Sequence, residues 1–236
     1  MIKAIFFDLY GTLIDIRTDE YDDSVYETLS RYLSYYSFNI PPDELKKSYF
    51  ALIQKDMQNS KEKYPEVDVY KIFFSILQGY GRKKCPKYFV TNIALFFRAL
   101  TLKHFSVFDG SYDVINTIAK KYKIAIISDA QWIFAEPEMS VLGIDQLFNT
   151  KILSSKMGFK KPDIRLFTYA MEKFGVKSEE SIYIGDNPMK DLKGAKNAGM
   201  RFILFGSEYR EYNGLYPDRC FYHYSELIGI LNEIEK

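Results

Sequence analysis

Near its start the chain reads KAIFFDLYGTLID (residues 3–15), where four apolar residues run into Asp8 and a tyrosine, a glycine and a threonine follow closely. A continuous apolar run such as residues 4–7 is typical of a strand buried on both faces of a parallel sheet, although a buried helix segment has the same pattern. Gly11 then interrupts the pattern, so we expect the strand to end near Asp8. Because open parallel sheets bind ligands beyond the carboxyl ends of their strands, Asp8 is either a functional residue or a capping residue of a turn.

Two later stretches repeat this design. KIAIISDA (residues 123–130) ends its apolar run in Ser128 and Asp129, and SIYIGDN (residues 181–187) ends its run in a glycine and Asp186. Turn chemistry alone explains poorly why three apolar strands each end in a hydroxyl or a carboxylate group. If the three strands are parallel neighbours, these polar side chains meet at one edge of the sheet.

Carboxylates gathered at one edge repel one another unless a cation or a proton relieves the repulsion. Neither histidine and neither cysteine of the chain is adjacent to the three strand ends, so the available ligand atoms are oxygens. Oxygen ligands suit a hard cation. The cluster of Asp8, Ser128, Asp129 and Asp186 is therefore predicted to suit a hard ion such as Mg²⁺.

Composition sets further bounds on the protein. A chain of 236 residues fits one large domain, or one domain with a substantial insertion. Its formal net charge of +1 argues against a nucleic-acid-binding protein held by a strong electrostatic field. Cys85 and Cys220 form neither a disulfide framework nor a metal-ligand spacing, which favours a reducing cytoplasm. No apolar run is long enough to span a membrane, and the N-terminus does not resemble a signal peptide.

The pattern of elements changes along the chain. From about residue 17 to 103 we expect helices only, at 22–36, 42–58, 68–79 and 88–103. From residue 105 onward strands and helices alternate, which predicts βαβ units and a parallel sheet. The expected strands are 123–128, 151–154, 181–184 and 201–205, and the expected helices are 111–122, 164–174, 191–198 and 224–235. A core domain of residues 1–16 and 105–236 is thus interrupted by a helical domain, 17–104, lying over the acidic cluster as a lid.

Four stretches in order carry a resemblance to a known family. DLYGTLID, ISDA, GFKKPDIRLF and YIGDNPMKDLKGAKNAGM resemble the four ordered signatures of the haloacid dehalogenase superfamily. The resemblance implies an α/β fold, with a Rossmann-like parallel sheet flanked by helices and an inserted all-helical cap domain. The block at 17–104 resembles such a cap in position only, because it contains no diagnostic motif.

The resemblance also implies roles for individual residues. Asp8 corresponds to the nucleophile, and Ser128 to the hydroxyl that hydrogen-bonds the transferring phosphoryl group. Lys161 corresponds to the lysine that offsets the charge of the nucleophile and the substrate, although the neighbouring Lys160 could exchange roles with it. Thr12 completes the expected phosphate-binding residues together with Asp129, Ser128 and Lys161.

The same family pattern implies a Mg²⁺ cofactor. Asp186 and Asp191 correspond to the acidic pair that positions the ion, while Asp8 and the backbone carbonyl of Tyr10 complete the ligands. Each residue also has an ordinary interpretation, since Asp191, for example, suits the N-terminal turn of a helix.

Tyr10 departs from the phosphatase pattern. Phosphatases of the superfamily carry an aspartate here, which protonates the leaving oxygen, whereas DxYGTL resembles the metal-independent 2-haloacid dehalogenases. The fourth signature points the other way, because Asp186 occupies a metal-ligand position where dehalogenases have no acid.

We therefore expect a Mg²⁺-dependent phosphatase that acts on a small phosphorylated metabolite through an aspartyl-phosphate on Asp8. A dehalogenase, or a protein that binds a phosphorylated ligand without turnover, is the alternative. Neither nucleic acid nor a membrane is an expected partner, and Tyr10 is a candidate catalytic residue alongside Asp8 and Lys161.

Overall fold

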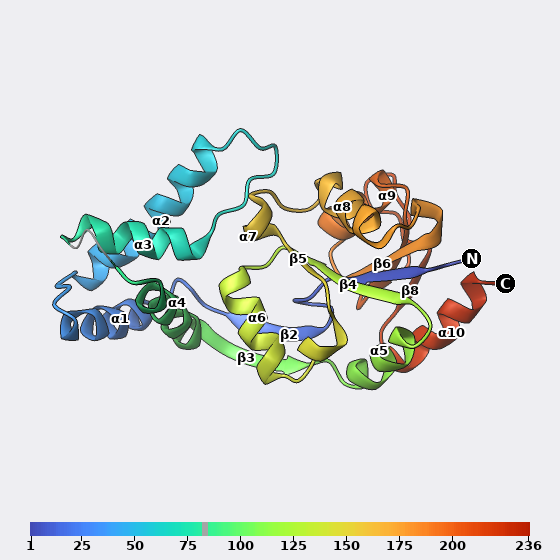
Figure 1. Ribbon diagram of the computed structural model, residues 1–236, viewed down its shortest axis with the longest axis horizontal. Coiled ribbons are helices and arrows are strands. Elements are labelled where there is room, and N and C mark those ends of the chain that lie inside the picture. Colours follow the sequence, from blue (N-terminus) through green and yellow to red (C-terminus); the bar gives the residue numbers. More distant parts are fainter. Residues whose placement is uncertain (82–84) are drawn as a thin grey trace.

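A six-stranded, all-parallel sheet forms the centre of the computed structural model, which describes residues 1–81 and 85–236 (Figure 1). The strand order is β5-β4-β1-β6-β7-β8, so β1 lies between the strands of the two later polar stretches. Phe7 at the end of β1 is level with Ile126 of β4 and with Ile184 of β6. The bounds are β1 (Ala4–Phe7), β4 (Lys123–Ser128), β5 (Lys151–Leu153), β6 (Ser181–Gly185), β7 (Arg201–Phe205) and β8 (Arg219–Phe221).

Helices cover both faces of this sheet. Ile5 and Phe7 face a core shared with α5 (Ser111–Ala119), α6 (Trp132–Val141) and α10 (Tyr224–Ile234). Ala4 and Phe6 face the opposite core, which contains α8 (Ile164–Phe174) and α9 (Lys193–Asn197). Because alternate residues of a strand point to opposite faces, the continuous apolar run at the start of the chain fills both cores. The predicted α/β architecture is confirmed.

A helical insertion lies at one end of the molecule, on the left in Figure 1. It consists of α1 (Asp23–Tyr35), α2 (Pro42–Asn59), α3 (Val69–Gly79) and α4 (Lys87–Thr101). These helices share a core with Ile133 and Phe134 of α6, and within it Tyr26, Tyr49 and Phe97 pack ring against ring. The aromatic residues that recur at helical spacing thus serve packing, as burial of large rings favours.

An antiparallel ribbon joins the insertion to the sheet, and here the expectation of helices alone was wrong. β2 (Ile14–Thr18) pairs with β3 (Leu102–Val107), so strand structure extends into both ends of the segment 17–103. The β-branched residues of β2 and its partial exposure suit a two-stranded ribbon. The division into domains 1–16 with 105–236 and 17–104 stays a prediction, since the ribbon crosses both boundaries.

The loop between α2 and α3 reaches back to the sheet domain (Figure 1). The backbone N–H of Lys160 donates to the Tyr64 carbonyl at 2.9 Å, and that of Glu66 donates to the Gly158 carbonyl at 3.1 Å. The Ser154 hydroxyl donates to the Glu66 carboxylate at 2.6 Å. The insertion therefore contacts the chain directly before Lys161.

Further elements complete the fold. They are α7 (Ser154–Met157), short 3₁₀ helices at Asp145–Leu147 and Ser178–Glu180, and a π-helical turn, η3 (Pro188–Leu192), ahead of α9. The sequence did not predict α6, which contains Pro137, or the short strand β8. It predicted one helix at 191–198, where the chain forms η3 and then α9.

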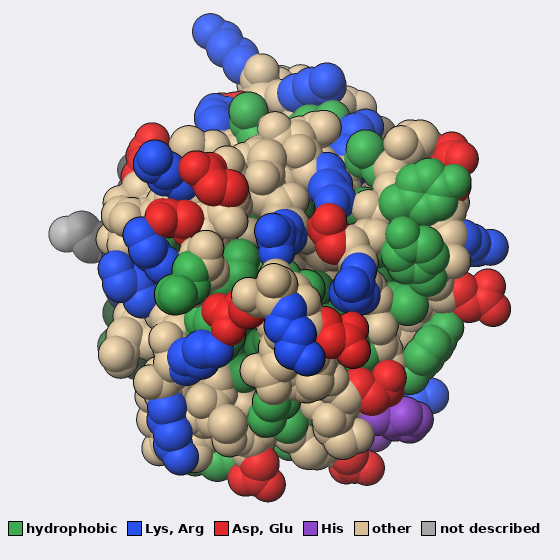
Figure 2. Space-filling view, turned by 90° about the vertical axis from the view of Figure 1, so that its right-hand side faces the viewer, with side chains coloured by type: hydrophobic (Ala, Val, Ile, Leu, Met, Phe, Trp, Pro, Cys, Tyr) green, Lys and Arg blue, Asp and Glu red, His purple; other side chains and the backbone are tan. Residues whose placement is uncertain are grey.

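The surface opposite the insertion carries acidic and basic side chains in a mixed arrangement, without a large patch of one sign (Figure 2). Among the described residues no helix has the length and apolar character that crossing a membrane requires.

Candidate active site

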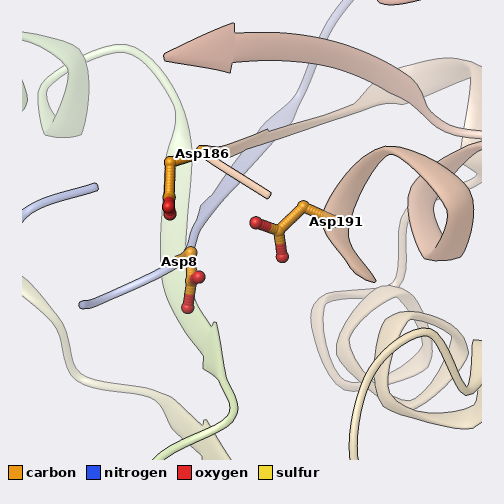
Figure 3. A group of neighbouring side chains, drawn as sticks. All are labelled: Asp8, Asp186 and Asp191. Atoms are coloured by element: carbon orange, nitrogen blue, oxygen red, sulfur yellow. The ribbon is translucent and has the colours of Figure 1, made fainter. Parts of the chain in front are cut away.

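Three carboxylates meet at the carboxyl edge of the sheet (Figure 3). Asp8 directly follows β1, Asp186 directly follows β6, and Asp191 lies in η3. One oxygen of each carboxylate lies within 4.8 Å of the others. Asp191 is fully buried and Asp8 nearly so. The structure thus brings Asp8 and Asp186, which the sequence placed at strand ends, together with Asp191, which the family resemblance added.

Two glycines make this close approach possible. A Cβ atom on Gly11 would lie 2.6 Å from Asp186 Oδ2, and a Cβ on Gly185 would lie 2.5 Å from Asp191 Oδ2. Gly11 also has a φ of 80°, a left-handed conformation that glycine adopts without steric cost. The sequence marked Gly11 only as a break after the strand, but its lack of a side chain is needed at the acidic cluster itself.

Lys161 lies at the centre of the negative charge. Its Nζ is 2.9 Å from Asp8 Oδ2 and 2.6 Å from Asp191 Oδ1, and its residue exposure is 2%. Burial alone would lower the pKa of the Lys161 ammonium, but the charges of Asp191 and Asp8 hold it above its usual value. Lys160 instead donates its backbone N–H to the insertion loop. Of the two adjacent lysines, Lys161 therefore faces the carboxylates.

The cluster retains uncompensated negative charge. Burial, followed by the charge of Asp8, raises the pKa of the Asp186 carboxyl. Burial also raises the pKa of Asp191, with Lys161 offsetting part of the effect. Within residues 1–81 and 85–236, the Lys161 ammonium pairs with Asp8 and Asp191, and Asp186 has no ion pair. An all-oxygen donor set with this charge fits a hard divalent cation such as Mg²⁺.

Thr12, predicted to bind phosphate, contacts a carboxylate of the cluster in this structure. Its side chain is fully buried, and its hydroxyl donates to Asp186 Oδ1 at 2.9 Å. The hydroxyl is thereby committed to orienting a candidate metal ligand. Asp191 is oriented similarly, because its Oδ2 accepts the backbone N–H of Asn187 at 2.9 Å.

A cavity of about 150 Å³ opens onto the cluster. Asp129, a predicted phosphate-binding residue, lies in its wall, where Oδ1 accepts the backbone N–H of Lys161 at 2.8 Å. Oδ2 lies 3.3 Å from Lys190 Nζ. Sequence reasoning missed Lys190, although it directly precedes Asp191 in the fourth family signature. The lining residues are Asp8, Tyr10, Ser128, Asp129, Lys161, Asp186, Asn187 and Lys190.

Tyr10 contributes to the cavity wall, but its hydroxyl is bound elsewhere. The hydroxyl donates to Glu138 of α6, whose other carboxylate oxygen lies 2.6 Å from Nε of Arg98 on α4. The Arg98 guanidinium also lies 5.5 Å from the centre of the Tyr10 ring. Burial, and then the charge of Glu138, raises the pKa of Tyr10. Tyr10, a candidate catalytic residue, is thus a weaker acid than a free tyrosine. We call Tyr10, Arg98 and Glu138 the Tyr10 network.

Sequence comparisons agree with the four signatures. Residues 5–205 match the family model described as haloacid dehalogenase-like hydrolase. The chain is 25% identical over 238 residues to a glyceraldehyde 3-phosphate phosphatase of Methanocaldococcus jannaschii, with all of both chains covered. It is 37% identical over 98 residues to a glyceraldehyde 3-phosphate phosphatase of Methanothermobacter thermautotrophicus, a match that spans 42% of this chain and 43% of the relative.

The fold also resembles solved structures. A 2-haloacid dehalogenase from Pseudomonas syringae superposes with a TM-score of 0.67 at 21% identity, and 99% of each chain is covered. At this identity the likeness concerns the fold and leaves the reaction open.

Proposed function

The chain belongs to the haloacid dehalogenase-like hydrolases, and on that premise we propose that it is a Mg²⁺-dependent phosphatase of small phosphate monoesters, acting through an aspartyl-phosphate on Asp8. The observation that carries the proposal is the buried cluster of three carboxylates around one lysine. Relatives named as phosphatases, one of them aligned along its whole length, support phosphate ester hydrolysis. The small cavity supports a small substrate, because typical ligand pockets measure about 300–1,000 Å³.

In this mechanism Asp8 is the nucleophile. A carboxylate oxygen of Asp8 attacks phosphorus, and the bond between phosphorus and the ester oxygen breaks. The ester oxygen leaves with the bonding electron pair and takes a proton from solvent water to become the alcohol. Water then attacks the phosphorus of the aspartyl-phosphate, which releases inorganic phosphate and restores Asp8. Lys161, held 2.9 Å from Asp8, keeps this carboxylate oriented and adds positive charge next to the phosphoryl group. The Ser128 hydroxyl lines the same cavity and is available to a phosphoryl oxygen.

Asp8, Asp186, Asp191 and the backbone carbonyl of Tyr10 would hold the Mg²⁺ ion. When bound, the ion supplies Lewis-acid polarisation of the phosphoryl group and neutralises the charge of its ligands. The roles of this chain's own residues are positional: Thr12 and the Asn187 backbone orient Asp186 and Asp191, and Asp129 holds the backbone of Lys161. The insertion of residues 17–104 would act as the cap that limits access to the cavity. The two cysteines favour a cytoplasmic location.

Carbon–halogen cleavage is the second candidate, because a tyrosine stands two residues after Asp8. Asp186 argues against it, since a metal-free site would leave this buried carboxylate repelling the nucleophile.

Product release with and without metal separates these reactions. We expect phosphate release from 4-nitrophenyl phosphate in Mg²⁺, its loss in EDTA and its recovery when Mg²⁺ is restored. Chloride release from 2-chloropropionate that EDTA does not affect would favour the dehalogenase instead. Binding of phosphate with neither reaction would favour a non-catalytic binding protein.

A further inference from the structure

The proposed phosphatase lacks an obvious group to assist the departing oxygen. When the ester bond to phosphorus breaks, the electron pair stays on the leaving oxygen, and a poor leaving group such as an alkoxide needs that charge stabilised. The Tyr10 hydroxyl is bound to Glu138, and burial raises its pKa further from the range of a useful acid. Lys161 is committed to Asp8 and Asp191 on the nucleophile's side.

Lys190 is the other cation in the wall of the cavity. Its backbone is fixed by Asn187, whose side-chain oxygen accepts the N–H groups of Met189 and Lys190 at 3.0 and 3.2 Å. Its side chain remains 44% exposed, in contrast to the buried Lys161. The backbone is thus held while the ammonium can reach the cavity.

The ion pair with Asp129 holds the Lys190 ammonium at the cavity but does not use its N–H groups as hydrogen-bond donors. Nζ lies 3.3 Å from Asp129 Oδ2, yet this buried oxygen accepts no hydrogen bond from any residue that the structure describes. The pair is therefore attracted by charge but poorly aligned. The N–H groups of the ammonium are left for a ligand in a cavity that also contains Asp8, the proposed nucleophile.

We propose that Lys190 is a catalytic residue that donates a hydrogen bond to the leaving oxygen and stabilises its developing negative charge. The inference rests on the proposed phosphatase function. Lys190 donates this hydrogen bond without transferring its proton, and the alkoxide takes its proton from solvent water after the bond has broken. A donor aimed at developing charge is worth about 10²–10³-fold in rate in other enzymes.

The test compares two esters whose leaving groups differ in basicity. With Lys190→Met, we expect kcat for ethyl phosphate to fall about 10²-fold, while kcat for 4-nitrophenyl phosphate changes little, because nitrophenolate carries its charge without help. Lys190→Arg should restore most of the rate on ethyl phosphate, since arginine keeps the charge and the donors. Lys193→Met is the matched control, because this exposed lysine lies three residues further on and does not line the cavity.

A binding measurement distinguishes this role from ordinary substrate binding. By calorimetry with Mg²⁺, ethyl phosphate should bind Asp8→Asn and Asp8→Asn/Lys190→Met with similar affinity, because the ester oxygen carries little charge before the bond breaks. Equal rate losses on both esters, or clearly weaker binding by the double variant, would overturn the proposal and leave the phosphatase in place. If the wild-type protein hydrolyses no phosphate ester, the phosphatase and the role of Lys190 both fail.

Discussion

Two mostly buried groups of charged side chains each include a residue of the same short stretch, Asp8 in one and Tyr10 in the other, and the groups differ in how their charge is balanced. The strand-end cluster of Asp8, Asp186 and Asp191 holds three carboxylates against the single ammonium of Lys161. The Tyr10 network holds one guanidinium against one carboxylate, with the tyrosine hydroxyl donating to the same carboxylate.

The excess negative charge of the strand-end cluster indicates a site for a cation, whereas the charges of the Tyr10 network balance without a ligand. Excess negative charge in a buried position is unfavourable, so the strand-end cluster calls for a cation. The Tyr10 network is neutral as it stands, and it ties the loop after β1 to α6 and to α4 of the insertion. We expect the first group to control turnover and the second to control stability.

Substitution of the nucleophile gives the largest expected effect. Asp8→Asn keeps the size of the side chain but removes the attacking oxygen anion, so phosphate release should fall by at least about 10⁴-fold. Folding should be preserved. Asp15→Asn, in the same stretch but outside the cavity lining, is the control and should keep its rate. A comparable loss in both variants would mean that Asp8 has no special role.

Arg98→Met tests whether the Tyr10 network is structural. Arg98 and Glu138 each expose 12% of their side chains, so removing the guanidinium leaves a mostly buried carboxylate without its ion pair. The free energy of unfolding in urea should fall by about 3–5 kcal/mol, and Arg98→Met/Glu138→Gln should recover much of that loss. Arg165→Met, which breaks an exposed pair with Glu62, should have a much smaller effect. Unchanged stability in Arg98→Met would remove the distinction between the two groups.

A smaller change is expected for Tyr10→Phe, which deletes only the hydroxyl. Loss of this hydrogen bond should lower the free energy of unfolding by about 1 kcal/mol. Because the hydroxyl is bound to Glu138, the ratio of the rates on ethyl phosphate and 4-nitrophenyl phosphate should stay the same. A selective loss on ethyl phosphate would show instead that Tyr10 assists the leaving group.

The smallest expected effect is on the pH dependence of stability, through the carboxylate of Glu20, which lies near Arg98. Burial raises the pKa of Glu20, and the Tyr49 hydroxyl, 3.2 Å away, and Arg98 lower it only in part. The native state therefore binds the proton more tightly than the unfolded chain does. Stability from this group is complete below the usual glutamate pKa of about 4.3 and is lost as the pH rises through the native pKa. In Glu20→Gln, the free energy of unfolding in urea should fall less as the pH rises through this range. The same pH dependence as in the wild type would contradict the raised pKa of Glu20.

The positions of Asp8 and Asp186 could be predicted from sequence because their signals are local, whereas Asp191 was assigned through the family resemblance. Each aspartate of the apolar stretches follows its own strand, and the parallel register aligns those ends, so chain position alone places Asp8 near Asp186. The Tyr10 network left no such signal. Its residues come from a loop and two helices, and Arg98 and Glu138 belong to different parts of the fold.

Other features depended on contacts that no local pattern encodes. Thr12 lies in a recognised motif, but which oxygen its hydroxyl contacts depends on the position of Asp186, 174 residues away. Lys161 rather than Lys160 faces the carboxylates because its ammonium contacts Asp8 and Asp191, which come from distant parts of the sequence. The ribbon of β2 and β3 was missed because its strands pair across the whole insertion.

A Mg²⁺ titration followed by thermal unfolding tests the central claim that the strand-end cluster is completed by a cation. Binding to the native state alone stabilises a protein by about 2.7 kcal/mol at a hundredfold excess over Kd. We predict that Mg²⁺ raises the Tm of the wild type and of Arg98→Met. Asp186→Asn should start from a higher Tm in EDTA, because repulsion is relieved, and should gain nothing from the metal. Equal shifts in the wild type and Asp186→Asn, or no shift in either, would contradict the account.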